Sequence, residues 1–169
     1  MEIRHEVRFA LAVDMTAAEA TRFARDVPRT LRHADFLADL QVVAGDPAVV
    51  SAAIPVSAAM FGQRELPFRS VLVPTAAGAR LEGTPLEPDG PGWALVSGEA
   101  RVSPEGAGRS RIDYAFDITV HLKLPRAERW GERALTRMIE FTARTVLTRV
   151  ATELPRAVAR AAGVAAVVA

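Results

Sequence analysis

Cysteine is absent from this chain of 169 residues, which excludes disulfide bonds, catalytic thiolates and zinc sites with cysteine ligands. Long apolar runs are absent too, since the most apolar stretch, residues 161–169, is far shorter than the roughly 20 residues of a membrane-spanning helix. Residues 1–13 alternate charged and apolar side chains, which is typical of a strand and not of a signal peptide. These absences predict a cytoplasmic protein without a membrane span.

Net charge is nearly absent as well. The chain has 21 Lys and Arg against 20 Asp and Glu, and its formal charge of +1 gives no electrostatic reason to expect nucleic acid or an anionic membrane as the main partner. Every basic residue except Lys123 is arginine, and alanine is abundant throughout, which we interpret as a GC-rich coding bias. The length predicts one domain, residues 1–160, followed by a short apolar tail, residues 161–169.

The N-terminal region predicts a strand followed by two short helices. Residues 2–13 place their apolar side chains on one strand face. Thr16 and Glu19 then have the spacing of a capping box, which marks the start of a helix. Pro28 fits the first turn of a second helix but not the interior of one long helix. We therefore expect the second helix to run through PRTLRHADFL.

From Leu40 onward, turn residues divide the chain into short segments that predict strands. Pro55 and Pro67 lie within two of these strands and cannot donate to a ladder, so each is expected at an edge or a bulge. The predicted strands are LQVVAG, AVVSAAIPVSAAMFG, RELPFRSVLVP, GARLEGTPL, WALVSGEARV and RIDYAFDITVHLKLP. The last of them alternates without a break and has one dry face.

A 3.6-residue period replaces the alternation from Arg126 and predicts a long C-terminal helix. We expect Pro155 to bend or stop this helix. The dry face of the last strand and the dry face of the helix must cover each other, because neither element buries its apolar side alone. The expected apolar stripe of the helix consists of Leu135, Met138, Ile139, Thr142, Val146 and Val150.

This order of elements resembles the helix-grip fold of the START and Bet v 1 superfamily, also called the polyketide-cyclase or SRPBCC-like superfamily. The resemblance covers roughly residues 2–160 and rests on the element order, on the paired helices TAAEATRFARDVPRTLRHA, and on the closing strand GRSRIDYAFD that runs into the final helix. The chain looks like an uncharacterised bacterial branch. The resemblance implies an α+β domain in which a curved antiparallel sheet of six or seven strands wraps around the C-terminal helix, often enclosing a hydrophobic cavity.

A few polar residues on the predicted dry faces are candidates for chemistry. His5 is in phase with the inward residues of the first strand, so its side chain is expected to point into the protein. It is either a buried neutral histidine with a structural role, a polar anchor of a ligand, or a general base. Tyr114 is the only tyrosine and either fills the core or lines a cavity. Thr142 lies on the inward helix stripe, where its hydroxyl can bond the preceding turn. His33 is expected at the surface, near the end of the second short helix.

We expect no metal, no cofactor and no catalytic residue. Asp113, Asp117 and His121 share the outer face of the last strand, but residues four apart on a strand are separated by about 13 Å, too far to share an ion. The chain also lacks the HExxH motif, a glycine-rich phosphate loop and the G-x-S-x-G nucleophile elbow.

Three functions remain open from the sequence. The first is a non-enzymatic binder of an apolar or amphipathic small molecule, and this is the one that we expect. The second is a cyclase-like or dehydratase-like enzyme that uses His5 or Tyr114 as acid or base. The third is an interaction module with a filled core, acting through Trp130, Phe141 or an edge strand, and a homodimer is also left open. Small residues in the middle strands leave room for a cavity, whose expected lining is His5, Phe68, Leu81, Val96, Ala100, Tyr114, Phe116, Met138 and Thr142.

Overall fold

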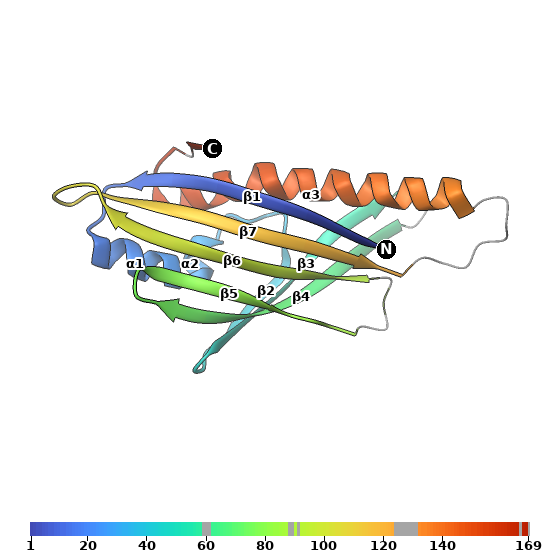
Figure 1. Ribbon diagram of the computed structural model, residues 1–169, viewed down its shortest axis with the longest axis horizontal. Coiled ribbons are helices and arrows are strands. Elements are labelled where there is room, and N and C mark those ends of the chain that lie inside the picture. The colour runs from blue at the N-terminus through green and yellow to red at the C-terminus, as the bar shows by residue number, and fades with distance from the viewer. Residues whose placement is uncertain (59–61, 88–89, 91, 124–131, 166, 169) are drawn as a thin grey trace.

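Antiparallel strands form the largest part of the structure, with two short helices near the start of the chain and one long helix near its end (Figure 1). The computed structural model describes residues 1–169 except 59–61, 88–89, 91, 124–131, 166 and 169. The elements are, in chain order, β1 (Glu2–Val13), α1 (Ala17–Arg25), α2 (Val27–Thr30), β2 (Ala38–Val43), β3 (Ala48–Ala58), β4 (Gly62–Thr75), β5 (Gly78–Thr84), β6 (Gly92–Pro104), β7 (Ser110–Leu122), α3 (Glu132–Ala162) and β8 (Val167–Val168).

The strands form one sheet in the order β2-β3-β4-β5-β6-β7-β1-β8. From β2 to β7 each strand pairs antiparallel with the next one in the chain. β1 then joins the far side of β7 without a register shift, from Glu2 opposite His121 to Val13 opposite Ser110. The two residues of β8 add to β1 beside Phe9 and Ala10. Together with α3 this is the α+β helix-grip arrangement, so the predicted fold is confirmed.

The core lies between the inner face of the sheet and the three helices. In Figure 1, α3 runs lengthwise along the sheet, while α1 and α2 lie at one end of it. The inward side chains of β1 and β7 alternate with exposed ones, and Leu11 and Ile112 are completely buried. Leu147 and Val158 of α3 belong to the same apolar cluster. Helix and sheet therefore cover each other's dry faces, as their sequence periods predict.

The short helices begin as predicted, but the second one is shorter than expected. Thr16 caps α1 through a reciprocal capping box, in which Glu19 N donates to Thr16 Oγ1 (3.3 Å) and Thr16 N donates to the Glu19 carboxylate (2.8 Å). Pro28 lies in the first turn of α2. The prediction that α2 continues beyond Thr30 is wrong, because the chain turns there and buries Phe36 in the core.

Pro55 of β3 and Pro67 of β4 lie where, among the described residues, their strand pairs with a neighbour on one side only. The pairing of β3 with β2 ends at Ala53, two residues before Pro55. The pairing of β4 with β5 begins at Arg69, two residues after Pro67. Proline is tolerated at such places when its nitrogen faces the unpaired side, and the one-sided pairing agrees with the edge assignment of both prolines.

The long helix does not stop at Pro155, which was one of the two expected outcomes there, and its buried face differs from the predicted one. It passes through Pro155 without interruption and ends at Ala162, although proline removes one bond of the helical ladder. Its most buried face contains Ala143, Leu147 and Leu154, whereas most of the predicted stripe is half-buried. The predicted start near Arg126 lies outside the described residues. None of the described helices combines the length and the apolar character needed to cross a membrane.

Candidate functional site

Three stacked aromatic rings form one wall of the candidate site. Phe9 of β1 lies opposite Tyr114 of β7, and their ring centroids are 4.8 Å apart with planes 13° from parallel. Phe116 extends this stack at 6.2 Å from Tyr114 and 6.4 Å from Phe9. All three rings point toward the helices, because their positions share the inward parity of the two strands. The stack fixes the orientation of the Tyr114 ring within the core.

The Tyr114 hydroxyl is buried without a hydrogen-bond partner among the described residues. The residue is only 4% exposed. Burial raises the pKa of the Tyr114 phenol well above its ordinary value, because the ionised form would lose its hydration. The site therefore holds a neutral phenol that can donate or accept a hydrogen bond.

An apolar pocket of about 50 Å³, which we call the inner pocket, lies next to this ring. Helices α1 and α2 and one residue of α3 form one side of it, and strands β4 to β7 form the other. Its lining residues are Ala24, Val27, Thr30, Leu31, Leu72, Ala79, Arg80, Leu81, Gly98, Glu99, Ala100, Tyr114, Phe116 and Val158.

Small side chains next to the aromatic stack create the space. Ala79, Ala100 and Tyr114 are direct neighbours across β5, β6 and β7, so two methyl groups lie beside the tyrosine ring. In the next row, Gly98 lies between Leu81 and Phe116. A Cβ atom at Gly98 would come within 2.5 Å of the Phe116 ring, so that ring lies directly over the glycine backbone. The pocket exists because β5 and β6 carry small residues at this level.

Polar groups at the helix side of the inner pocket are already hydrogen-bonded. The buried Thr30 hydroxyl donates to the Phe23 carbonyl at 2.8 Å. Arg25 of α1 donates from Nε to the Gly78 carbonyl (2.9 Å) and from Nη2 to the Thr75 carbonyl (2.5 Å). Arg25 thereby fastens α1 to the turn between β4 and β5. The Tyr114 hydroxyl is the only buried side-chain polar atom without a partner in the described part of the chain.

The opposite face of the sheet carries a wider, open hollow of about 490 Å³, which we call the outer hollow. Charged side chains of β1, β5, β6 and β7 line it together with the small residues Gly83, Ser97 and Ala115. Arg80, Leu81, Gly98, Glu99 and Phe116 line both the inner pocket and the outer hollow. Because Gly98 has no side chain, the two spaces are separated there by little more than one backbone and the Phe116 ring.

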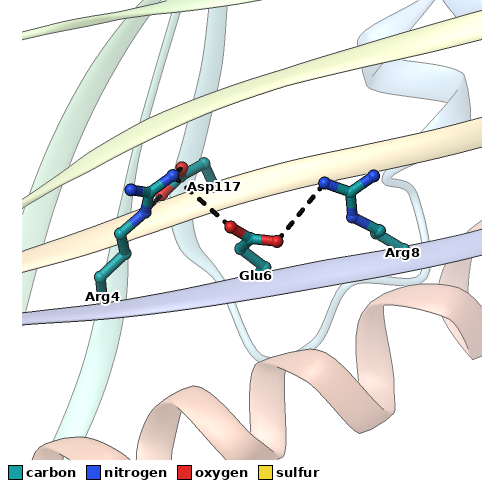
Figure 2. A network of polar contacts seen from close by, with 4 residues as sticks. All are labelled: Arg4, Glu6, Arg8 and Asp117. Atoms are coloured by element: carbon teal, nitrogen blue, oxygen red, sulfur yellow. Dashed lines mark hydrogen bonds and ion pairs between the residues drawn. The ribbon is translucent and has the colours of Figure 1, made fainter.

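Ion pairs organise the β1 wall of the outer hollow (Figure 2). Arg4 donates to Asp117 of β7 through Nε (3.0 Å) and Nη2, and it also lies 3.5 Å from Glu6. Arg8 reaches Glu6 at 3.4 Å from the other side. Hydrogen bonding to Asp117 raises the pKa of the Arg4 guanidinium above its ordinary value. Arg4 therefore contacts the carboxylates of both Asp117 and Glu6, whereas Arg8 has a looser contact, with the Glu6 carboxylate.

The structure brings four of the predicted cavity residues together. Leu81, Ala100, Tyr114 and Phe116 line the inner pocket. The other five are placed elsewhere, outside the lining of this pocket. Phe68 and Val96 are buried in the main apolar cluster, and the half-buried residues are His5, Met138 and Thr142.

Half of the ten lining residues that the sequence did not predict lie in the helices or, in the case of Leu31, directly after α2. Ala24, Val27, Leu31 and Val158 line the inner pocket, but α2 has only four residues and is too short for a helical period to reveal its inward face. Ala79 could have been predicted from the sequence. It follows the turn glycine Gly78 and lies two positions before Leu81, so both side chains are on the same face of β5.

The remaining polar candidates do not converge on a metal or catalytic site. Asp117 binds Arg4, Asp113 lies 2.9 Å from Arg111, and the His121 ring stacks on Trp93 at 4.1 Å. Within the described ranges, no group of three or more metal-binding side chains is close enough to hold an ion. Ser110 is buried, and its hydroxyl donates to the Met15 carbonyl at 2.9 Å.

Comparisons with known proteins support this description of the fold. The model of a family described as "Protein of unknown function (DUF3809)" matches residues 8–152, and no curated protein matches the chain significantly. The Zhui aromatase/cyclase from a Streptomyces species has a TM-score of 0.53 at 17% identity, with 94% of each chain covered. The di-domain ARO/CYC StfQ from the steffimycin biosynthetic pathway also has 0.53 at 17% identity, over 96% of this chain and 50% of its own.

A START superfamily protein from Mycobacterium smegmatis has a TM-score of 0.47 at 15% identity, over 86% of this chain and 97% of its own. At 17% identity, the two structures with a TM-score of 0.53 show the fold alone and nothing about chemistry.

Proposed function

The chain belongs to the DUF3809 family of proteins of unknown function and has the START-like helix-grip fold, and from this premise we propose that it binds a small molecule in the inner pocket. The ligand has an apolar body and one hydrogen-bonding group, which contacts the Tyr114 hydroxyl. The cytoplasmic location expected from the sequence is part of this proposal.

The unpartnered Tyr114 hydroxyl is the observation that carries the proposal. A buried polar group without a hydrogen bond costs about 1–3 kcal/mol, and native proteins rarely leave one. Water is a poor occupant of the pocket, because a buried water typically makes about three hydrogen bonds. The surrounding wall is mostly alanine, valine and leucine. An apolar molecule with a single polar atom matches this wall better than water does.

The inner pocket is smaller than an organic ligand requires. Its volume of about 50 Å³ is well below the roughly 300–1,000 Å³ of typical small-molecule sites. Binding therefore requires side chains of the wall to move. Leu31, at the end of α2, and Phe116, over Gly98, are both half-buried and can be displaced at lower cost than fully buried neighbours.

Two observations favour binding over the enzymatic alternative. Burial keeps Tyr114 protonated, so it cannot serve as a general base near neutral pH. His5, the other candidate acid or base, is not among the residues that line the inner pocket. The charged residues of the lining are occupied in ion pairs, Arg80 with Glu82 and Glu99 with Arg101.

The interaction-module alternative requires a filled core and acts through Trp130, Phe141 or an edge strand, and its two aromatic candidates receive little support. Phe141 is 72% exposed on α3, but single exposed apolar side chains are ordinary on protein surfaces. Trp130, the other candidate, lies outside the described residues. A filled core also leaves no role for the buried Tyr114 hydroxyl.

The proposal is tested with N-phenyl-1-naphthylamine, a fluorescent probe with an apolar body and a single N–H group. We expect saturable binding to the native protein and an affinity about 5- to 10-fold lower for Tyr114→Phe, the loss of roughly one hydrogen bond. Native mass spectrometry of the protein purified from its own host would then reveal the natural ligand as a mass that Tyr114→Phe retains poorly.

Ser110→Ala is the matched control. It removes another buried hydroxyl from β7, but this hydroxyl is bonded to the Met15 carbonyl and lies outside the inner pocket. The control should lose stability and keep its affinity for the probe. Equal probe affinity of Tyr114→Phe and the wild type, or fluorescence that does not saturate, contradicts the proposal.

A further inference from the structure

In the described part of the chain, one edge of the sheet is a long stretch of strand that pairs on one side only. β1 pairs with β7 along its whole length, from Glu2 to Val13. On its other side it pairs with β8, and among the described residues this pairing comprises only Phe9 and Ala10. The segment Glu2–Arg8, which we call the open edge, is therefore an edge strand. Edge strands offer their backbone groups to a further strand.

The hydrogen bonds at the start of β1 determine which residues offer these groups. Met1 N donates to Leu122 O, and Leu122 N donates back to Met1 O, both at 2.8 Å. The ladder continues from there without a register shift. In an antiparallel pair, residues bonded to the partner alternate with residues whose N–H and C=O point the other way. The even-numbered residues of the open edge therefore aim their backbone groups outward, away from β7.

The charges on the open edge alternate in sign. Glu2, Arg4, Glu6 and Arg8 follow one another on the outer face, and their side chains are between 52% and 71% exposed. The inward residues Ile3 and Val7 are buried beneath them. His5 is the central residue of the segment. When a second copy of this segment runs antiparallel to the first, each glutamate lies opposite an arginine and each arginine opposite a glutamate.

We propose that the open edge pairs with the open edge of a second copy of the chain, antiparallel and about a two-fold axis at His5. In this register Glu2 lies opposite the partner's Arg8, and Arg4 lies opposite the partner's Glu6. These are the residues whose backbone groups point outward, so each pair exchanges two N–H···O bonds as well as carrying opposite charges. Ile3 lies opposite the partner's Val7 on the inner face.

The two sheets then form one continuous sheet, and both copies contribute the same residues to the interface, which is therefore isologous. A register shifted by two residues in either direction places like charges opposite each other, which opposes slippage. The looser contact of Arg8 with Glu6 leaves Arg8 free to reach the partner's Glu2 (Figure 2). Arg4 keeps its bonds to Asp117, because these lie on the β7 side of the strand.

Sedimentation velocity over a concentration series tests the proposal with two variants. Arg8→Glu places like charges opposite each other at two symmetry-related positions, and we expect the dimer dissociation constant to rise at least about tenfold. Glu2→Arg combined with Arg8→Glu restores the opposite charges with the signs exchanged, and we expect the dimer to return. Circular dichroism establishes that both variants are folded.

Amide hydrogen exchange locates the interface independently. The amides of Arg4 and Glu6 should be protected in the wild type at high concentration and should exchange rapidly on dilution. A wild-type chain that stays monomeric throughout the series overturns the proposal, and so does a dimer in which these amides exchange rapidly. A folded double variant that does not recover the dimer overturns it as well.

Discussion

Phe9 and Tyr114 face each other across the β1–β7 ladder with their rings stacked at 4.8 Å. The two residues are 105 positions apart in the sequence, and their contact joins the first strand to the last long one. The same contact holds the Tyr114 hydroxyl in the core, where it has no partner among the described residues.

Replacing Tyr114 with phenylalanine should stabilise the ligand-free protein. The ring stack is kept, while the desolvation cost of the unpartnered hydroxyl is removed, so we expect the free energy of unfolding to increase by about 1 kcal/mol. Urea denaturation of the protein refolded from denaturant, and so freed of any co-purified ligand, measures this change. A loss of stability instead would mean that the hydroxyl has a hydrogen-bond partner in the ligand-free protein.

Stability should fall at high pH because of the same residue. Burial raises the pKa of Tyr114 in the folded state, whereas the unfolded chain ionises near its ordinary value of about 10. Above that pH the unfolded state loses the proton first, so the free energy of unfolding decreases, by at most about 1.4 kcal/mol per pH unit from this group.

The Tyr114→Phe variant isolates this effect, because it lacks the group while all other titrations are unchanged. The difference in stability between wild type and variant should widen from about pH 9 to pH 11. Since Tyr114 is the only tyrosine, phenolate absorbance in the near ultraviolet reports its ionisation directly. Phenolate that appears at an ordinary pH in the folded protein would show that the hydroxyl is exposed to water.

Filling the inner pocket should prevent ligand binding. Ala100 is a direct neighbour of Tyr114 on the next strand and lines the pocket, so Ala100→Trp places a large ring in the space. We expect affinity for N-phenyl-1-naphthylamine to fall at least about tenfold and stability to fall by about 1–3 kcal/mol from overpacking. Ala18→Trp, on the exposed face of α1, is the control and should change neither value appreciably.

Loosening α1 should destabilise the wall of the inner pocket. Arg25→Met keeps the apolar stem but removes both hydrogen bonds to the carbonyls of Thr75 and Gly78. We expect a loss of about 1–3 kcal/mol in urea denaturation, with faster hydrogen exchange in α1. Arg22→Met changes an exposed arginine of the same helix and should have little effect. Equal stability of the two variants would mean that Arg25 does not hold the helix.

The fold was largely predictable because its signals are local. The unbroken alternation in β1 and β7, the capping box of Thr16 and Glu19, and the position of Pro28 each follow from neighbouring residues. The length of α2 was not predictable, since it depends on the burial of Phe36 against distant elements. The buried face of α3 was also misplaced, because the C-terminal half of the helix is more buried than the half on which the predicted stripe was centred.

The site was predictable only on the strand side. Leu81, Ala100, Tyr114 and Phe116 share the inward parity of their strands, and parity is readable in the sequence. Which helix faces them is a matter of packing between elements far apart in the chain, so the contribution of α1 and α2 could not be foreseen. The unpartnered state of the Tyr114 hydroxyl likewise depends on the three-dimensional surroundings of one atom.

The position of β1 in the sheet has a consequence for how the protein folds. The strands from β2 to β7 pair with neighbours in sequence, but Arg4 meets Asp117 across 113 residues. Pairings between such distant segments are slow to form, since a long loop must close before any contact compensates for its entropy. During synthesis β1 has to wait, unpaired, until β7 has left the ribosome. The apolar face of that waiting strand stays uncovered for this time, and the inner pocket acquires its aromatic wall only once β7 has paired with β1.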